Sequence, residues 1–134
     1  MKRGYILSAV LIGAMASACG SDDSDDTAST TSSTCTASTW TDVNTVLTSS
    51  CMTSCHTASG SAASYWALTS DSKENHTTVT ANTTRVNTSS TASSTLLTKP
   101  TQDGVTHTGG SIFVKDDEKY NAIKAWLDAG APCT

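Results

Sequence analysis

The chain has 134 residues and a formal net charge of −4, with 12 acidic and 8 basic residues. This mild negative charge excludes the basic surface that nucleic-acid-binding proteins use, so we expect no nucleic acid as a partner. Large apolar side chains are sparse while serine and threonine are abundant. We therefore expect a thin core, because small domains bury proportionately little surface.

Residues 1–18 have the features of a secretory signal. Basic residues precede an apolar run over residues 5–14, and small residues follow just before Cys19. This arrangement resembles the lipobox of bacterial lipoproteins, which implies lipidation of Cys19 and a membrane anchor; an ordinary signal peptide with a surviving thiol is the alternative. Because Gly20 follows Cys19, the resemblance favours anchoring to the outer membrane. We expect an exported protein in the periplasm or at the cell surface.

Residues 19–39 are predicted to form a disordered tether. Serine, threonine, aspartate and alanine dominate this stretch, and it contains no large apolar residue that could offset the entropy cost of ordering. The remaining residues, 40–134, are predicted to form one mainly α domain with long Ser/Thr-rich loops. Its first element is a short helix over residues 40–47, capped by Thr41 or Asp42.

The most specific motif follows this helix. Cys51 and Cys55 are separated by three residues, and His56 comes directly after the second cysteine. Two cysteines followed at once by a histidine are typical of covalent c-type haem attachment, in which both thiols form thioethers and the imidazole binds the iron. The more common spacing is two residues. A disulfide between the two cysteines and a zinc site that includes His56 are therefore alternatives.

The middle of the domain is less informative. Tyr65, Trp66 and Leu68 form an aromatic and apolar cluster that we expect to pack in the core. Residues 71–94 are polar and are predicted to be mostly irregular loop. Residues 94–97 are predicted to form one turn of helix that ends before Pro100.

His107 is the second candidate iron ligand. Gly109 and Gly110 follow it, and residues without a Cβ allow the backbone to lie close to a large flat group. His76 is a weaker candidate, because it lies in a polar tract with nothing to hold it over a porphyrin. A site that is open or occupied by water at the sixth position is the remaining alternative.

The closing helix has the clearest pattern. Asp116 is its expected N-cap, and Gly130 is expected to end it in a left-handed conformation with a proline close behind. One apolar stripe at helical spacing is expected to face the core. Its members are Tyr120, Ile123, Trp126 and Leu127.

In sum, the order of these segments resembles the small class I cytochrome c fold, and more closely a group of exported bacterial cytochrome c-like domains that often occur on lipoproteins. Three segments carry the resemblance beyond the cysteine motif: residues 96–100, residues 107–110 and residues 120–132. The resemblance implies a single covalent haem c, with the N- and C-terminal helices crossing beside it. It also implies a distal ligand in the region of His107. No methionine follows Met52, so the usual His-Met ligation is not expected.

These features predict electron transfer between redox partner proteins, by a haem held on Cys51 and Cys55 with His56 and His107 as iron ligands. With Cys19 lipidated, Cys35 and Cys133 remain and are predicted to form a disulfide. The sequence contains no paired carboxylates, activated serine or phosphate-binding loop that would indicate an enzyme. Two other functions remain open: a haem-bearing module that senses a small ligand, and a cofactor-free, disulfide-stabilised lipoprotein that acts by binding.

Overall fold

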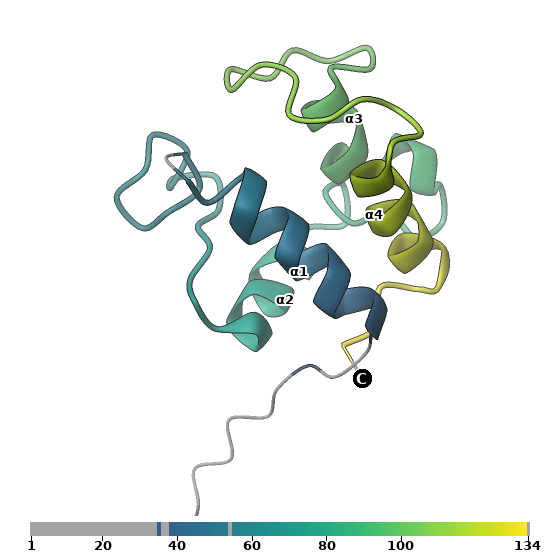
Figure 1. Ribbon diagram of the computed structural model, residues 1–134, viewed down its shortest axis with the longest axis horizontal. Coiled ribbons are helices and arrows are strands. Elements are labelled where there is room, and N and C mark those ends of the chain that lie inside the picture. Colours follow the sequence, from purple (N-terminus) through teal and green to yellow (C-terminus); the bar gives the residue numbers. More distant parts are fainter. Residues whose placement is uncertain (1–34, 36–37, 54, 134) are drawn as a thin grey trace, which may run out of the picture. The chain divides into compact units, whose positions relative to one another are not determined.

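The computed structural model describes Cys35, residues 38–53 and residues 55–133. Within these residues the regular secondary structure is helical, as predicted (Figure 1). The elements are α1 (Ser38–Ser50), α2 (Ser72–Thr80), the short 3-10 helix η1 (Thr91–Ser93), α3 (Thr95–Thr101) and α4 (Glu118–Asp128). None of the described helices is both long enough and apolar enough to cross a bilayer. The predicted signal, Cys19 and most of the predicted tether lie outside the described residues.

The pairing of α1 with α4 is the central contact of the domain (Figure 1). Cys35, shortly before α1, is bonded to Cys133, shortly after α4. At the opposite end of the pair, Lys119 Nζ in the first turn of α4 donates to Ser50 Oγ at the end of α1, at 3.0 Å. The two helices therefore run in opposite directions, with a link at each end.

Two tryptophans fill the interface between these helices. The stripe predicted for the closing helix is buried as expected. Within it, the Trp126 ring lies 5.1 Å from that of Trp40 on α1, and both side chains are fully buried. Trp126 Nε1 donates to the carbonyl of Pro132 at 2.9 Å, and Trp40 Nε1 donates to Ser72 Oγ at 2.9 Å. Because both indole N–H groups have partners, burying these rings leaves no unpaired donor.

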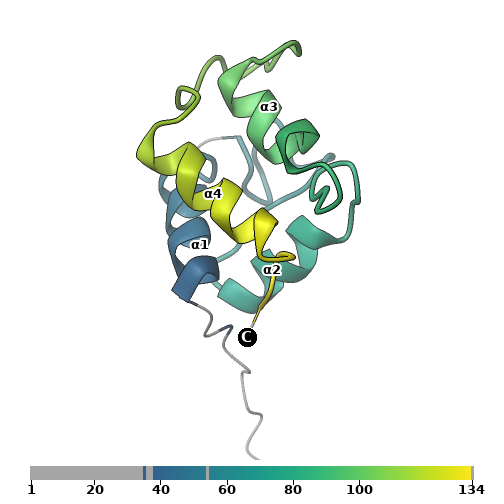
Figure 2. The same cartoon turned by 90° about the vertical axis from the view of Figure 1, so that its right-hand side faces the viewer.

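The prediction of mostly irregular loop over residues 71–94 is wrong for α2 and η1, and the residues between these two helices are irregular as expected. Asp71 caps α2 through its side chain, and α2 lies beside the start of α1 and near the C-terminal segment (Figure 2). The fully buried Asn75 stabilises this packing. Its amide nitrogen donates to Asn44 Oδ1 on α1 at 2.9 Å, and its oxygen accepts from the backbone of Thr69 at 2.8 Å. Because Asn75 is polar, its burial in this helix could not be recognised from a periodic pattern of apolar residues in the sequence.

The helix predicted to stop before Pro100 instead continues through it, since α3 extends to Thr101. Pro100 is buried, and its carbonyl accepts a hydrogen bond from Ile112 N at 2.8 Å. This packing offsets the loss of one helical hydrogen bond at a proline. Gln102 then ends the helix with a φ of 57°.

The two long helices also begin at other residues than predicted. α1 starts at Ser38, before the expected caps at Thr41 and Asp42. The N-cap of α4 is Asp117, whose carboxylate accepts from Tyr120 N at 2.8 Å, and not Asp116, which has a φ of 67°. The end of α4 agrees with the prediction, because Gly130 has a φ of 87°.

The disulfide between Cys35 and Cys133 is the pairing that the sequence predicts, and it closes a loop of 98 residues. It joins the start of α1 to the residues after α4, next to the buried tryptophans. The cross-link restricts the unfolded chain far more than the folded one. Its stabilising effect is therefore expected to be large in so small a domain.

We expect the double substitution Cys35→Ser and Cys133→Ser to lower the free energy of unfolding by about 4–5 kcal/mol, the chain-entropy value for a loop of this length. Urea unfolding of the oxidised wild type and of the double variant measures this difference. Equal unfolding midpoints for the two proteins would show that the cross-link does not stabilise the domain.

Candidate functional site

A cavity of about 780 Å³ lies at the end of the α1–α4 pair away from the disulfide. Leu47 of α1 and Ile123 of α4 form part of its apolar wall, together with Leu96, Pro100 and Phe113. Its volume falls within the range of about 300–1,000 Å³ that is usual for small-molecule and cofactor sites. Four chemically reactive side chains line it: Cys51, Cys55, His56 and His107.

A backbone turn at the end of α1 brings the predicted attachment residues to this cavity. Cys51 N still donates to Leu47 O at 2.8 Å, so Cys51 continues the last turn of the helix. His56 N donates to Cys51 O at 3.1 Å, which closes the hexapeptide on itself. The three-residue spacing between the cysteines is thus accommodated in a hydrogen-bonded turn, and both thiols border the same cavity.

Both of these cysteines are free thiols. Burial raises the pKa of the Cys51 thiol to about 11, partly opposed by the charge of Lys119. The thiol is therefore protonated near neutral pH. The alternative of a Cys51–Cys55 disulfide is not the state that the structure shows.

His56 is oriented with one ring nitrogen available for a metal. Its Nδ1 lies 3.1 Å from the carbonyl oxygen of Trp66. A carbonyl can only accept, so Nδ1 carries the hydrogen and Nε2 keeps its lone pair. Burial lowers the pKa of His56, although the Trp66 carbonyl acts in the opposite direction. The imidazole is therefore neutral at pH 7, which is the form that binds metals.

The ring of Trp66 also stacks on His56. The two ring centroids lie 4.1 Å apart with an angle of 33° between the planes. Of the predicted aromatic cluster, Leu68 is buried in the core and Trp66 lines the cavity, but Tyr65 is 79% exposed, so the expectation that Tyr65 packs in the core is wrong. Trp66 thus holds His56 in two ways, through its backbone carbonyl and through its indole ring.

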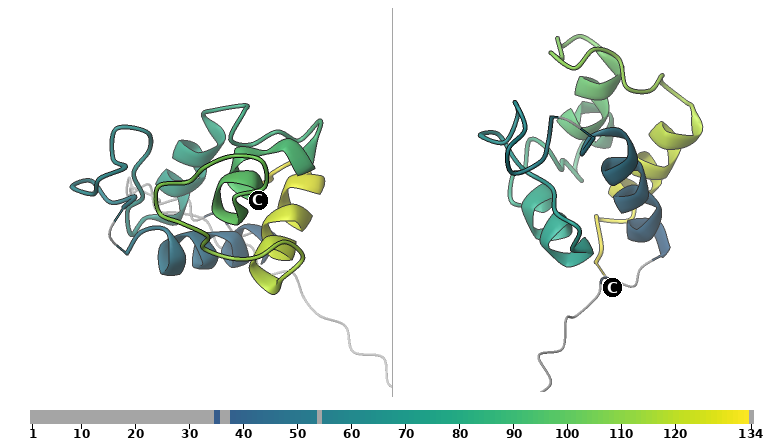
Figure 3. Two further views of the ribbon diagram at one scale, coloured as in Figure 1. Left: turned by 90° about the horizontal axis from the view of Figure 1, so that it is seen from above. Right: turned by 60° about the vertical axis from the view of Figure 1, so that its left-hand side comes forward.

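His107 lies in the segment between α3 and α4, which extends beyond these helices in the views of Figure 3. Its Nδ1 is 2.9 Å from the carbonyl oxygen of Gly110, which leaves Nε2 of the ring without a hydrogen-bond partner from this carbonyl and available as a metal ligand in the neutral tautomer. His107 also lies close enough to His56 to contribute to lowering the pKa of His56. The structure therefore brings both predicted histidines to one cavity, each with Nδ1 bound by a backbone carbonyl.

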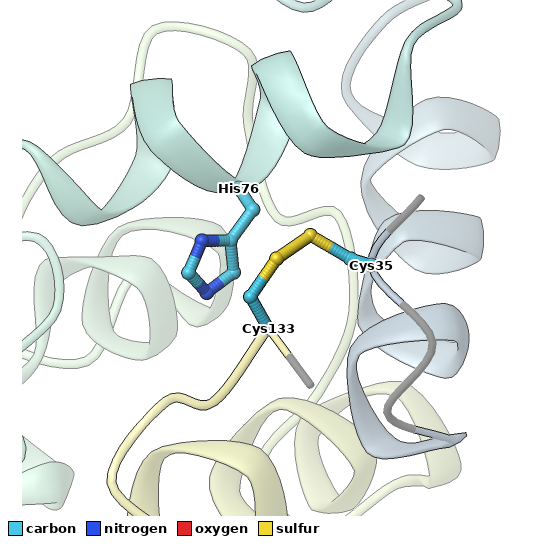
Figure 4. A group of neighbouring side chains, drawn as sticks. All are labelled: Cys35, His76 and Cys133. Atoms are coloured by element: carbon cyan, nitrogen blue, oxygen red, sulfur yellow. A yellow bond between two sulfur atoms is a disulfide. The ribbon is translucent and has the colours of Figure 1, made fainter. Parts of the chain in front are cut away.

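His76 does not line this cavity. It packs against both Trp40 and Trp126 near the disulfide, with ring centroids 4.9 and 5.8 Å away, and its Nε2 lies 3.0 Å from the carbonyl oxygen of Ala131. Figure 4 shows His76 beside the bonded sulfur atoms of Cys35 and Cys133. These three residues are close enough to group as metal ligands, but sulfur atoms in a disulfide provide no thiolate. Among the described residues no such group includes Cys51, Cys55 or His56.

Sequence reasoning missed one cavity residue with a defined geometry, Arg85. Its guanidinium lies over the Trp66 ring at 5.1 Å and donates to the carbonyl oxygens of Thr78 at 2.7 Å and Tyr65 at 3.3 Å. Arg85 lies in a Thr- and Asn-rich tract without apolar periodicity. The only sequence signal was its isolation as the sole charged residue between Glu74 and Lys99.

Gly109 provides the space in which the His107 ring lies. A Cβ at this position would be 3.0 Å from His107 Cε1. With an alanine here the ring would have to move by a few tenths of an ångström, and its hydrogen bond to Gly110 opposes that movement. Gly109 does not have the left-handed φ that disfavours alanine, which makes the steric contact the only obstacle.

We expect Gly109→Ala to destabilise the domain by roughly 1 kcal/mol, as overpacking does. In a His107→Ala background the same change should be neutral or stabilising by about 0.4–1 kcal/mol, because alanine restricts the unfolded chain. Denaturant unfolding of the two single variants and the double variant measures both effects. Equal effects of Gly109→Ala in the two backgrounds would show that the ring is not held against Gly109.

Comparison of the chain with protein-family models, with characterised proteins and with solved structures gave no match. We therefore infer a function from the residues that line the cavity.

Proposed function

We propose that this chain transfers electrons through a single haem c bound covalently to Cys51 and Cys55. The observation that supports this most directly is that both free thiols line one cavity together with His56 and His107, whereas the other two described cysteines are joined in a disulfide. Two thiols and two imidazoles around a cofactor-sized, partly apolar cavity form a donor set that can hold a c-type haem.

The lining residues fit this group in their chemistry as well as their position. The two free thiols would provide the attachment sites, and His56 Nε2 and His107 Nε2 would provide iron ligands. Bound haem would supply an iron that changes between its ferrous and ferric states. The carbonyls of Trp66 and Gly110 hold the two imidazoles by Nδ1, as outer-shell partners of metal-binding histidines usually do.

We also propose a class I cytochrome c-like arrangement for the domain. The opposite-running α1 and α4 support this, because they pack together and both contribute residues to the wall of the cavity, Leu47 and Ile123. The disulfide supports an exported location, since disulfides persist in oxidising compartments. Together with the N-terminal sequence, it favours a lipid-anchored protein that exchanges electrons with redox partner proteins.

The proposal predicts covalent haem in protein produced with a haem-attachment system. We expect a pyridine haemochrome spectrum of c type, and haem that remains on the chain after extraction with acidic acetone. The variant Cys51→Ala/Cys55→Ala should lose this retention, because no thioether can form. The matched control Cys35→Ser/Cys133→Ser removes two cysteines outside the cavity and should keep the haem. Loss of all haem from the wild type in acidic acetone would contradict covalent attachment.

The proposal also predicts a low-spin ferric haem with two histidine ligands. His107→Ala should convert the spectrum to high spin, because it removes the sixth ligand. His76→Ala should leave the spin state unchanged while lowering stability, since His76 packs on the tryptophans. Electronic absorption and electron paramagnetic resonance spectra measure the spin state. A high-spin wild type would instead indicate an open iron position and favour binding of a small ligand.

A further inference from the structure

A cluster of three side chains that can bind metals lies at the end of the α1–α4 pair away from the cavity. Cys35, His76 and Cys133 each place one ligand atom within 4.8 Å of the other two (Figure 4). The two sulfurs are bonded to each other, so in the oxidised domain they provide no thiolate. Breaking that bond by reduction leaves two thiols beside an imidazole.

The three ligand atoms lie close to the separations of a zinc site. Zinc bonds to sulfur at about 2.3 Å and to nitrogen at about 2.0 Å, so the ligand atoms of a tetrahedral site are about 3.5–3.8 Å apart. The Cα atoms of Cys35 and Cys133 are 4.8 Å apart, so rotation of the two side chains is enough to separate the released sulfurs by that distance. The imidazole has to approach by little more than about 1 Å.

His76 is held in place by packing and by one hydrogen bond. Its ring packs against those of Trp40 and Trp126, at centroid distances of 4.9 and 5.8 Å. Its Nε2 lies 3.0 Å from the carbonyl oxygen of Ala131, and a carbonyl can only accept. In the neutral tautomer that donates this hydrogen bond, Nδ1 is available to a metal. A backbone carbonyl on the other ring nitrogen is a usual outer partner of a histidine ligand.

The segment that carries Cys133 has attachments other than the disulfide. Trp126 Nε1 donates to the carbonyl of Pro132 at 2.9 Å, and Ala131 N donates to the carbonyl of Trp126 at 2.9 Å. Neither bond involves a sulfur, so both can persist when the disulfide is reduced. Cys35 lies shortly before α1, which packs on α4. Reduction therefore leaves the two thiols near each other and near His76.

The donor set and its exposure determine which metal the cluster suits. Two thiolates and one imidazole favour zinc over magnesium or calcium, which take oxygen ligands. Cys35 is only 4% exposed, whereas His76 and Cys133 are partly exposed, so solvent can reach a fourth coordination position. Three protein ligands and one position open to water form a common zinc arrangement.

We propose that reduction of the Cys35–Cys133 disulfide converts this cluster into a zinc site, with Cys35, Cys133 and His76 as the protein ligands. The bound ion joins the segment before α1, helix α2 and the segment after α4. It thereby replaces the disulfide as the cross-link of the reduced domain. The site lies away from the cavity, so the inference does not depend on haem binding.

Thiol–disulfide exchange with a dithiol opens the site. The two bonded sulfurs gain two electrons and two protons, and the dithiol becomes a disulfide. Zinc then bonds to both sulfurs and to the imidazole, and the two thiol protons pass to solvent. Exchange with an oxidised dithiol reverses these steps, restores the Cys35–Cys133 bond and releases the ion.

The first test uses the full-length chain with Cys19→Ser, Cys51→Ala and Cys55→Ala, in which Cys35 and Cys133 are the only cysteines. The chain is reduced with a trialkylphosphine, which provides no thiolate ligand of its own. We expect it to bind one Co²⁺ per chain, with thiolate-to-cobalt charge-transfer absorption and the visible bands of tetrahedral cobalt. Zinc should displace the cobalt and remove these bands, because such a site prefers zinc. The oxidised chain should show no bands.

The second test examines the histidine ligand in the same reduced chain. His76→Ala removes the ring, whereas His76→Phe keeps an aromatic ring against the tryptophans and removes only the ligand atoms. Both should weaken zinc binding by roughly ten- to a hundredfold or more, since loss of even an outer partner has an effect of that size. The matched control His107→Phe changes a histidine at the cavity and should leave zinc binding as it was.

Urea unfolding provides a readout that does not depend on the spectrum. Zinc should raise the unfolding midpoint of the reduced chain and leave that of the oxidised chain unchanged, because only the reduced chain binds it. Absence of cobalt bands from the reduced chain would overturn the proposal. Bands and zinc affinity that His76→Phe leaves unchanged would also overturn it, since the cysteines alone would then hold the ion. Equal bands in the oxidised chain would contradict the requirement for reduction.

Discussion

The contact between Trp40 and Trp126 is the interaction on which the arrangement of this domain depends. It occupies the interface of α1 and α4 and concentrates the largest apolar side chains at one end, where the disulfide and His76 also lie. Further along the same helices, the buried side chains of Leu47 and Ile123 border a cavity. A chain with so few large apolar residues can fill one end of a helix pair but not both. The cavity is thus a consequence of composition as well as of fold.

The cavity combines apolar walls with ring nitrogens that are fixed by the backbone. Trp66 and Gly110 each bind an Nδ1 through a carbonyl, so no acidic side chain is needed to orient the imidazoles. Carboxylates in this role would have neutralised the nearby cations. No aspartate or glutamate lines the cavity, so Arg85 and Lys99 are the charged side chains of its lining beside the two histidines.

Much of this arrangement could be predicted from local sequence, and the rest depended on contacts between distant residues. The stripe on α4 and the turn at Gly130 follow from helical spacing and glycine conformation, and both agree with the structure. α2 was missed because Asn75 is buried by hydrogen bonds to Asn44 and Thr69 and not by apolar packing. Arg85 was missed for a similar reason, since its partners are backbone carbonyls, which leave no pattern of side chains in the sequence. The covalent haem and the lipid anchor remain predictions from the sequence motifs.

The burial of Cys51 also bears on how a chain with several cysteines forms the correct disulfide. With a pKa of about 11, only about one Cys51 side chain in ten thousand is a thiolate at pH 7, and thiol–disulfide exchange requires the thiolate. In an oxidising medium, the folded domain therefore protects this thiol kinetically, whereas Cys35 and Cys133 have already been consumed by each other. The position of one side chain at the end of α1 thus keeps its sulfur out of the exchange chemistry that has joined Cys35 to Cys133.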